Sequence, residues 1–335
     1  MWPPPTIQSV ARGRVDTVVV IRLSPASRSG RFKALVVACL IWAAGAPVTI
    51  PAQTRQAVPR VVVIGDLHAD LASARRALRL AGAIDNRDAW IGGPLVVVQV
   101  GDLIGRGQED RAVLEFALAL RTKARAAGGT LHFLVGNHEV FAARPDHRWV
   151  APEAFAAFDA LPGLNLRDPR VLALPARERS RFAALMPGGP LAMQIASFPA
   201  VLRLDDTVFA HGGVLPLWAR YGIDKINTEV QAWLQGRTSE PRPTLGLDDG
   251  SADDGVMWSR HFSTMPEPGV CALVDESLAL IGARRMIVGH TVQRAITSRC
   301  DGRIWAVDVG ISGYYGGRLQ VLEIVNGDQF RVLTE

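Results

Sequence analysis

Five short motifs place acidic, amide and imidazole side chains next to glycines. In chain order they read Gly-Asp-Leu-His at 65–68, Gly-Asp-Leu-Ile-Gly-Arg-Gly at 101–107, Gly-Asn-His-Glu at 136–139, His-Gly-Gly at 211–213 and Gly-His-Thr at 289–291. Each motif alone has an ordinary explanation as a turn or a surface histidine. Together they hold four of the chain's seven histidines, and each follows an expected strand. Their recurrence favours one shared chemical site.

Mixed carboxylate and imidazole ligands suit manganese, iron or zinc. Two such ions held close together can activate a hydroxide and neutralise a phosphoryl group. Asp102, in the middle of the first three motifs, is expected to bridge the ions, and Arg106 can fork onto phosphate oxygens. His138 is free to protonate a leaving oxygen. The polar side chains collected at the strand ends are Asp66, His68, Asp102, Asn137, His138, His211 and His290.

The first three motifs follow apolar runs at 58–64, 94–100 and 130–135, which are expected to be strands. Helical spacing at 71–80 and 108–127 separates them. This strand–helix–strand alternation, with a period of about 35 residues, is typical of βαβ units. Because parallel strands joined by right-handed crossovers end at the same edge, the three motifs should meet there.

The second half of the chain is expected to contain more strands than helices. A hairpin at 201–204 and 207–210 ends in the fourth motif, and a strand at 285–288 ends in the fifth. The further expected elements are helices at 223–234 and 270–281 and antiparallel strands at 304–309, 319–325 and 329–333. Residues 140–200 instead hold short helical patterns at 152–161 and 177–186, which predict a helical insertion over the site. The expected fold is one α/β domain over 58–335.

The charge of the chain is unevenly distributed. The formal net charge is +5, but residues 1–52 hold six basic side chains and one acid, so the remaining 31 basic and 31 acidic residues cancel. A neutral body argues against nucleic-acid binding, which needs a basic patch. The basic residues at 28–33 and the apolar run at 34–46 predict a signal peptide with its core at about 28–52. The expected location is the periplasm or the exterior, with no stable membrane span after cleavage; an uncleaved leader would be an anchor.

Two of the three cysteines lie outside the leader. Cys271 and Cys300 could form a disulfide in an oxidising compartment. Two separate buried thiols are an equally good explanation from the sequence alone.

The ordered motifs closely resemble those of the phosphoprotein phosphatase branch of the calcineurin-like metallophosphoesterases. Longer stretches, among them GNHEVFAARPDHRWV at 136–150 and IWAVDVGISGYYGG at 304–317, resemble the Shewanella-like protein phosphatases. The resemblance covers about residues 58–325. It implies a four-layer αββα sandwich with mixed sheets, and hydrolysis of phosphoprotein or aryl phosphate esters, with phosphotyrosine favoured.

The resemblance also implies roles for individual residues. Two divalent ions of unknown identity would be bound by Asp66, His68, Asp102, Asn137, His211 and His290. His138 would be the general acid, and Arg106 would bind the substrate phosphate together with Asn137. Arg260 is the candidate second phosphate ligand, and Tyr314 or Tyr315 is expected to line the pocket.

One position departs from the family pattern Gly-Asp-x-x-Asp-Arg-Gly. Gly105 stands where the second aspartate normally pairs with the acid histidine. Without that anion, His138 should have a lower pKa and a less fixed orientation, unless Glu139 or Asp70 takes its place. Restoring aspartate at position 105 is therefore expected to accelerate hydrolysis of esters with poor leaving groups.

Two alternatives to the phosphomonoesterase remain open from the sequence. One is a dinucleoside-polyphosphate hydrolase on the same scaffold. The other is a catalytically impaired metal-binding pseudophosphatase, motivated by Gly105.

Overall fold

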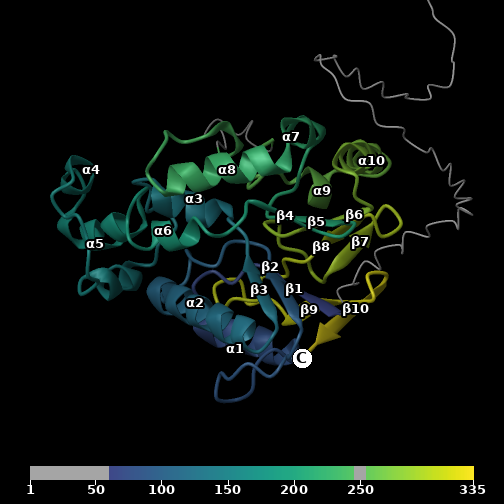
Figure 1. Ribbon diagram of the computed structural model, residues 1–335, viewed down its shortest axis with the longest axis horizontal. Coiled ribbons are helices and arrows are strands. Elements are labelled where there is room, and N and C mark those ends of the chain that lie inside the picture. Colours follow the sequence, from purple (N-terminus) through teal and green to yellow (C-terminus); the bar gives the residue numbers. More distant parts are fainter. Residues whose placement is uncertain (1–59, 245–253) are drawn as a thin grey trace, which may run out of the picture. The chain divides into compact units, whose positions relative to one another are not determined.

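The structure is a computed structural model that describes residues 60–244 and 254–335. The predicted leader at 1–52 lies outside the described residues. The described residues belong to one compact unit. Two mixed five-stranded sheets form its centre, and helices lie against their outer faces (Figure 1). The predicted α/β sandwich with mixed sheets is confirmed.

The first sheet has the strand order β10-β9-β1-β2-β3. Its strands are β1 (Arg60–Ile64), β2 (Val96–Gln99), β3 (Thr130–Phe133), β9 (Gln320–Val325) and β10 (Gln329–Thr334). β1, β2 and β3 are parallel, and Val61 pairs with Val96. The valines of β1 and β2 are almost all buried, as expected of strands covered on both faces.

The second sheet has the order β4-β5-β6-β8-β7. Its strands are β4 (Val201–Leu204), β5 (Thr207–Ala210), β6 (Arg285–Val288), β7 (Thr297–Arg299) and β8 (Ile304–Ala306). β5, β6 and β8 are parallel, whereas β4 and β7 are antiparallel edge strands. Each sheet therefore presents the carboxyl ends of three parallel strands.

Helices cover both sheets. α1 (Leu71–Leu80) and α2 (Asp110–Ala126) lie against the first sheet, and α7 (Pro216–Tyr221), α8 (Ile223–Leu234), α9 (His261–Thr264) and α10 (Gly269–Ile281) lie on the side of the second (Figure 1). The Asp70 side chain caps α1 by accepting a hydrogen bond from the Ser73 amide at 2.8 Å. α10 ends at Gly282 in the left-handed conformation. No helix of the described residues is long and apolar enough to cross a membrane.

The segment predicted as a helical insertion does consist of short helices. They are α3 (Asn137–Ala143), the 3₁₀ turns at Pro152–Ala154 and Ala156–Phe158, α4 (Pro169–Leu172), α5 (Ala176–Leu185) and α6 (Ala192–Ile195). Val171, Phe182, Ala183 and Met186 form a small apolar cluster of their own. The helix expected at 152–161 is corrected to the two 3₁₀ turns, because the amides of Ala154, Phe158 and Asp159 donate to carbonyls three residues earlier.

One expectation for the strands near the C-terminus is corrected. Of the three strands expected to be antiparallel, β9 and β10 are, but β8 runs parallel to β6. The short strand β7, which was not expected, turns the chain back so that β8 enters beside β6 in the same direction.

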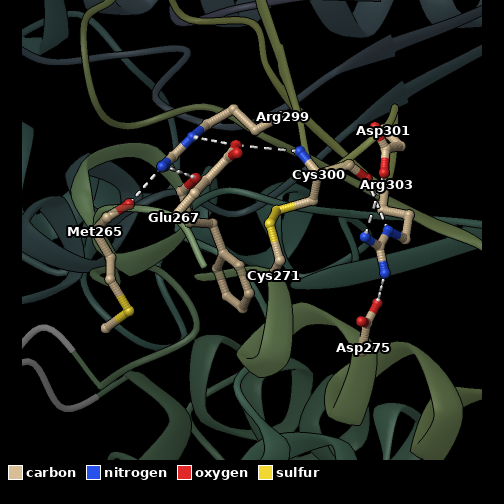
Figure 2. The surroundings of a disulfide bond; sticks show 9 residues. Met265, Glu267, Cys271, Asp275, Arg299, Cys300, Asp301 and Arg303 are labelled. Atoms are coloured by element: carbon tan, nitrogen blue, oxygen red, sulfur yellow. Dashed lines mark hydrogen bonds and ion pairs between the residues drawn. A yellow bond between two sulfur atoms is a disulfide. The ribbon is translucent and has the colours of Figure 1, made fainter. Parts of the chain in front are cut away.

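Cys271 on α10 and Cys300 after β7 form a disulfide with a Cα–Cα distance of 5.3 Å (Figure 2). The open alternative of two free thiols is thereby excluded for this structure. The bond lies among polar links that join the same two segments. Glu267 accepts a hydrogen bond from the Cys300 amide at 3.3 Å, and the Arg303 guanidinium bridges Asp275 and the Cys300 carbonyl.

Candidate active site

The five predicted motifs meet where the parallel strands of both sheets end. Three follow β1, β2 and β3, and two follow β5 and β6. Gly101 makes the close approach feasible, because a Cβ atom there would lie 2.9 Å from the backbone of Gly136 and from Nδ1 of His211. A side chain at position 101 would therefore force these motifs apart.

Several site residues adopt left-handed backbone conformations that residues other than glycine rarely adopt. The φ angles are +47° at His68, +55° at Asp102, +69° at Arg106 and +66° at His290. Such strain costs roughly 1–3 kcal/mol per residue and is concentrated at functional sites in proteins. Its recurrence in three motifs supports a shared functional role.

His68, Asp102 and His138 form the first group with metal-ligand spacing, their ligand atoms all lying within 4.8 Å of one another. Oδ2 of Asp102 lies 3.8 Å from Nε2 of His68 and 3.9 Å from Nε2 of His138. His138 thus lies among the potential ligands, and not apart from them as the sequence suggested.

Asp102, His211 and His290 form the second group within the same spacing. Nδ1 of His211 lies 3.0 Å from the Val100 carbonyl and must carry a proton to donate to it. Its Nε2 faces Oδ1 of Asn137 at 2.9 Å and Oδ1 of Asp102 at 3.3 Å. Burial opposes the charged ring, but the Asp102 carboxylate raises the pKa of His211, so Nε2 holds a proton between these oxygens. A divalent cation would take the place of that proton, because one nitrogen and two oxygen atoms converge there.

Asp102 is the residue common to both groups, which agrees with the bridging position predicted for it. Asp66 lies between them, with Oδ2 3.8 Å from Nε2 of His68 and Oδ1 3.9 Å from Nδ1 of His211. The amide of His290 donates to Asp66 at 3.2 Å. The structure therefore brings all six predicted metal ligands together.

The site also concentrates buried negative charge. Asp66, Asp102, Glu139 and Asp308 are each at most 2% exposed. Burial, together with the nearby Asp308 and Asp102, raises the pKa of Asp66 well above its usual range. Burial raises the pKa of Glu139 to about 7 and that of Asp308 to about 6. Buried carboxylates of like charge either take up protons or are stabilised by a cation held between them.

Oδ2 of Asp308 is a buried acceptor in the site with no hydrogen-bond partner in the described part of the chain. Together with the other carboxylates and the converging nitrogen and oxygen atoms, it fits a centre that holds divalent cations. The donors are nitrogen and oxygen atoms, as manganese, iron or zinc would require.

Arg106 lies beside this centre and is enclosed by aromatic side chains. Its guanidinium carbon is 4.1 Å from the centroid of Trp149 and 5.2 Å from that of Tyr314. Nη1 donates to the Tyr314 hydroxyl at 3.3 Å, and Nε has no partner in the described residues. A cleft of about 330 Å³ adjoins it, lined by His68, Asp70, Arg106, Gln108, Glu109 and Tyr314 among others.

The remaining predicted substrate residues lie on two sides of the centre. Nη1 of Arg260 donates to the His290 carbonyl and to the Thr291 hydroxyl, both at 3.3 Å. Arg260 therefore lies by the second metal-ligand group, and Arg106 by the first. The Tyr315 ring contacts His68 with a centroid distance of 5.2 Å, so both tyrosines border the site.

His138 occupies the space in which a side chain at position 105 would lie. Gly105 has a φ of +82°, and a Cβ atom on it would overlap Nδ1 of His138 and lie 2.9 Å from its Cγ. Restoring aspartate here would displace the imidazole, so this geometry argues against the gain in rate expected from the sequence, and we expect a loss instead. Burial lowers the pKa of His138 to about 3, in the predicted direction.

Neither predicted substitute for the missing aspartate is available to His138. Glu139 accepts hydrogen bonds from four backbone amides, those of Asp102, Leu103, Ile104 and Gly136. Asp70 accepts from Ser73 and from the Gly313 amide at 2.7 Å. Both carboxylates hold the loops of the site in place, and neither pairs with the imidazole.

Three residues of the site were not predicted from the sequence. Trp149 lies in the insertion, where no periodic pattern marked it. Asp308 follows β8 by two residues, the position that marks the other ligands, but no glycine precedes it. Glu139 was recognised only as part of a motif and as a substitute partner. Its role as an acceptor for two loops is visible only in the fold.

With this geometry established, comparison with known proteins assigns the chain to a family. A family model of calcineurin-like phosphoesterases matches residues 59–294. The chain is 36% identical to Shewanella-like protein phosphatase 2 of Arabidopsis thaliana over 84% of this chain and 79% of that one. It is 26% identical to Shewanella-like protein phosphatase 1 of Plasmodium berghei over 76% and 67%. The protein belongs to the calcineurin-like phosphoesterase family and is a relative of the Shewanella-like protein phosphatases.

A solved structure supports the same fold. The cold-active protein-tyrosine phosphatase of a psychrophilic Shewanella species superimposes with a TM-score of 0.65 at 22% identity, over 82% of this chain and 80% of that one. The predicted family, fold and phosphoesterase class are therefore confirmed, and the family implies divalent metal ions at the His and Asp cluster.

Proposed function

We propose that this phosphoesterase hydrolyses phosphate monoesters of phenolic hydroxyl groups, with phosphotyrosine in proteins as the favoured substrate, at a centre of two metal ions. The observation that carries the proposal is the position of Arg106 between Trp149 and Tyr314, directly beside the group of His68, Asp102 and His138. A phosphate-binding cation is thus surrounded by aromatic rings, which favour an aryl ester over a serine ester. The phosphatase relatives support the substrate class.

Asp66, His68 and Asp102 would hold the first ion, and Asp102, Asn137, His211 and His290 the second. Divalent ions held there would supply the Lewis acidity that lowers the pKa of water and neutralises phosphoryl charge. The metal identity, manganese, iron or zinc, is left to measurement.

The protein's own groups then bind and orient the ester. Arg106 donates hydrogen bonds from its forked guanidinium to the phosphoryl oxygens, and the Tyr314 hydroxyl holds that guanidinium in place by accepting from Nη1. Arg260 binds from the side of His290. His138 protonates the leaving oxygen as the P–O bond breaks. The Tyr315 ring excludes water beside His68.

The leader supports a location outside the cytoplasm, in the periplasm or secreted. The disulfide between Cys271 and Cys300 agrees with that proposal, because such bonds persist in oxidising compartments. Detection of the mature protein in a periplasmic or secreted fraction, with its N-terminus sequenced, tests it.

The decisive test compares a phosphotyrosine peptide, a phosphoserine peptide and diadenosine tetraphosphate as substrates for metal-loaded protein. We expect turnover in that order of preference, with Asp102→Asn as the inactive control. Preference for the dinucleotide would favour the dinucleoside-polyphosphate hydrolase. Turnover no higher than that of Asp102→Asn, with metal bound, would favour the pseudophosphatase, for which Gly105 beside His138 is the motivating observation.

A further inference from the structure

A buried ion pair links the helical insertion to the motif loop that follows β2. Among the residues that the structure describes, Arg181 on α5 is the largest fully buried side chain, with 1% exposure. Its Nε and Nη2 atoms lie 2.7 and 2.6 Å from Oδ2 of Asp110, the first residue of α2. Nη1 has no hydrogen-bond partner in the described residues. Within the described residues, Asp110 is therefore the carboxylate that pairs with this charge.

Asp110 uses its second oxygen at a different place. Oδ1 accepts a hydrogen bond from the Gly105 amide at 2.7 Å. Gly105 in turn packs so closely on the His138 ring that no side chain fits between them. A continuous line of contacts therefore runs from Arg181 through Asp110 and the Gly105 backbone to His138.

A stabilising role alone is a weak explanation for such a pair. Removing two charges from water costs several kcal/mol per ion, and apolar replacements of similar volume are often neutral or stabilising. A buried ion pair has a clearer role where it selects one local backbone geometry among several. Here the geometry fixed is that of the loop against which His138 packs.

We propose that Arg181 and Asp110 are positioning residues for His138, and that they hold the imidazole where the family's missing aspartate would otherwise orient it. The proposal rests on the proposed function, because it treats His138 as the general acid. In that step water adds to phosphorus, the P–O bond to the aryl oxygen breaks, and its electron pair remains on that oxygen. The oxygen takes a proton from the His138 imidazolium, which becomes the neutral imidazole, and the proton that the attacking water loses returns the ring through solvent to the imidazolium.

A variant in which His138 is misplaced should differ in its kinetics from a variant with a general structural defect. Proton transfer matters most when the leaving oxygen is a poor leaving group, whereas an activated phenolate departs without help. Misplacing His138 should therefore slow phenyl phosphate much more than 2,4-dinitrophenyl phosphate. A general structural defect should slow both esters by the same factor.

The experiment measures kcat and KM for a series of aryl phosphates with metal-loaded wild type, Arg181→Met, Arg181→Lys and Asp110→Asn. Arg177→Met is the matched control, since Arg177 lies on the same helix with its side chain 72% exposed. We expect Arg181→Met to lower kcat for phenyl phosphate by about 10- to 100-fold. For the dinitrophenyl ester we expect little change in kcat, and for both esters little change in KM. Arg181→Lys should recover part of the loss, and Arg177→Met should match wild type.

Asp110→Asn is nearly isosteric. It removes the negative charge that pairs with Arg181 but keeps an acceptor for the Gly105 amide. It therefore tests the same line of contacts if Arg181→Met fails to fold. Equal losses on all esters, or no loss in any folded variant, would overturn the inference and leave the proposed function intact. A wild-type protein that binds metal but hydrolyses no aryl phosphate would overturn both.

Discussion

The imidazole of His138 packs against the backbone of Gly105 so closely that a Cβ atom at position 105 would lie 2.9 Å from Cγ of the ring and nearer still to Nδ1. Gly105 also has a φ of +82°, which other residues rarely adopt. The observed position of His138 therefore requires glycine at position 105. The histidine ring occupies space that the family's aspartate would otherwise need.

Both Gly105→Ala and Gly105→Asp should lower activity, because each adds a Cβ atom that displaces His138. We expect kcat for phenyl phosphate to fall by about 10- to 100-fold in each case, with a smaller loss for activated esters. Kinetics on the two esters check this. If Gly105→Asp instead exceeds wild type while Gly105→Ala does not, aspartate restores the family arrangement and the packing seen here does not govern the rate.

Arg106→Met should lower kcat/KM by about 10²- to 10³-fold, since it removes a donor that stabilises the charge of the transferring phosphoryl group. Arg106→Lys should recover part of this, because an ammonium keeps the charge but loses the fork. Steady-state kinetics on a phosphotyrosine peptide measure both.

Trp149→Leu provides the companion variant to Arg106→Met. It keeps Arg106 but removes the ring that lies 4.1 Å from it. We expect a raised KM for aryl esters of about 10-fold, since a cation–π contact contributes about 0.5–2 kcal/mol. An unchanged KM would mean that Trp149 does not fix the guanidinium.

The metal ligands could be predicted because each lies within a few residues of a glycine-containing turn that ends a strand. The apolar pattern of β1, β2 and β3 is local, and parallel strands bring such turns together in any sheet. The sequence did not predict that His138 lies next to the Asp102 carboxylate. The orientation of the His138 ring depends on packing by several loops, which no local pattern records.

The residues that were missed depend on contacts between distant segments. Arg181 and Asp110 are 71 residues apart, and nothing in the local sequence around either one marks them as partners. Trp149 reaches Arg106 only because the insertion folds over the site, where the Arg106 amide donates to the Trp149 carbonyl at 2.7 Å. The direction of β8 likewise follows from strand β7, which is too short to leave a pattern.

Replacing both Cys271 and Cys300 with serine should lower the free energy of unfolding by at most about 3.5 kcal/mol on the chain-entropy model, for a closed loop of this length. The activity of the folded variant should match wild type, because no residue labelled around the bond in Figure 2 is one of the six predicted metal ligands. Denaturant titration with and without a reductant checks the prediction. A reductant that destabilises wild type but not the double variant would attribute the effect to this bond.

Removal of the metal ions should abolish activity and also lower the melting temperature. The four carboxylates of Asp66, Asp102, Glu139 and Asp308 are buried together, so without cations they repel one another. Ligands that bind the native state alone stabilise it by mass action, and readdition of Mn²⁺ or Zn²⁺ should therefore restore both properties. Differential scanning fluorimetry and elemental metal analysis measure the effect.

Among variants of the site, Asp102→Asn should lose the most metal, because Asp102 is the one residue shared by both ligand groups. Asp308→Asn should bind metal about as wild type does if its carboxylate only borders the centre, and about 10- to 100-fold more weakly if it holds a ligand in place. Asn removes charge with little change in shape, so altered binding reports on electrostatics rather than on packing. A metal content well below two ions per chain in saturated wild type would contradict the two-ion centre, whatever the activity.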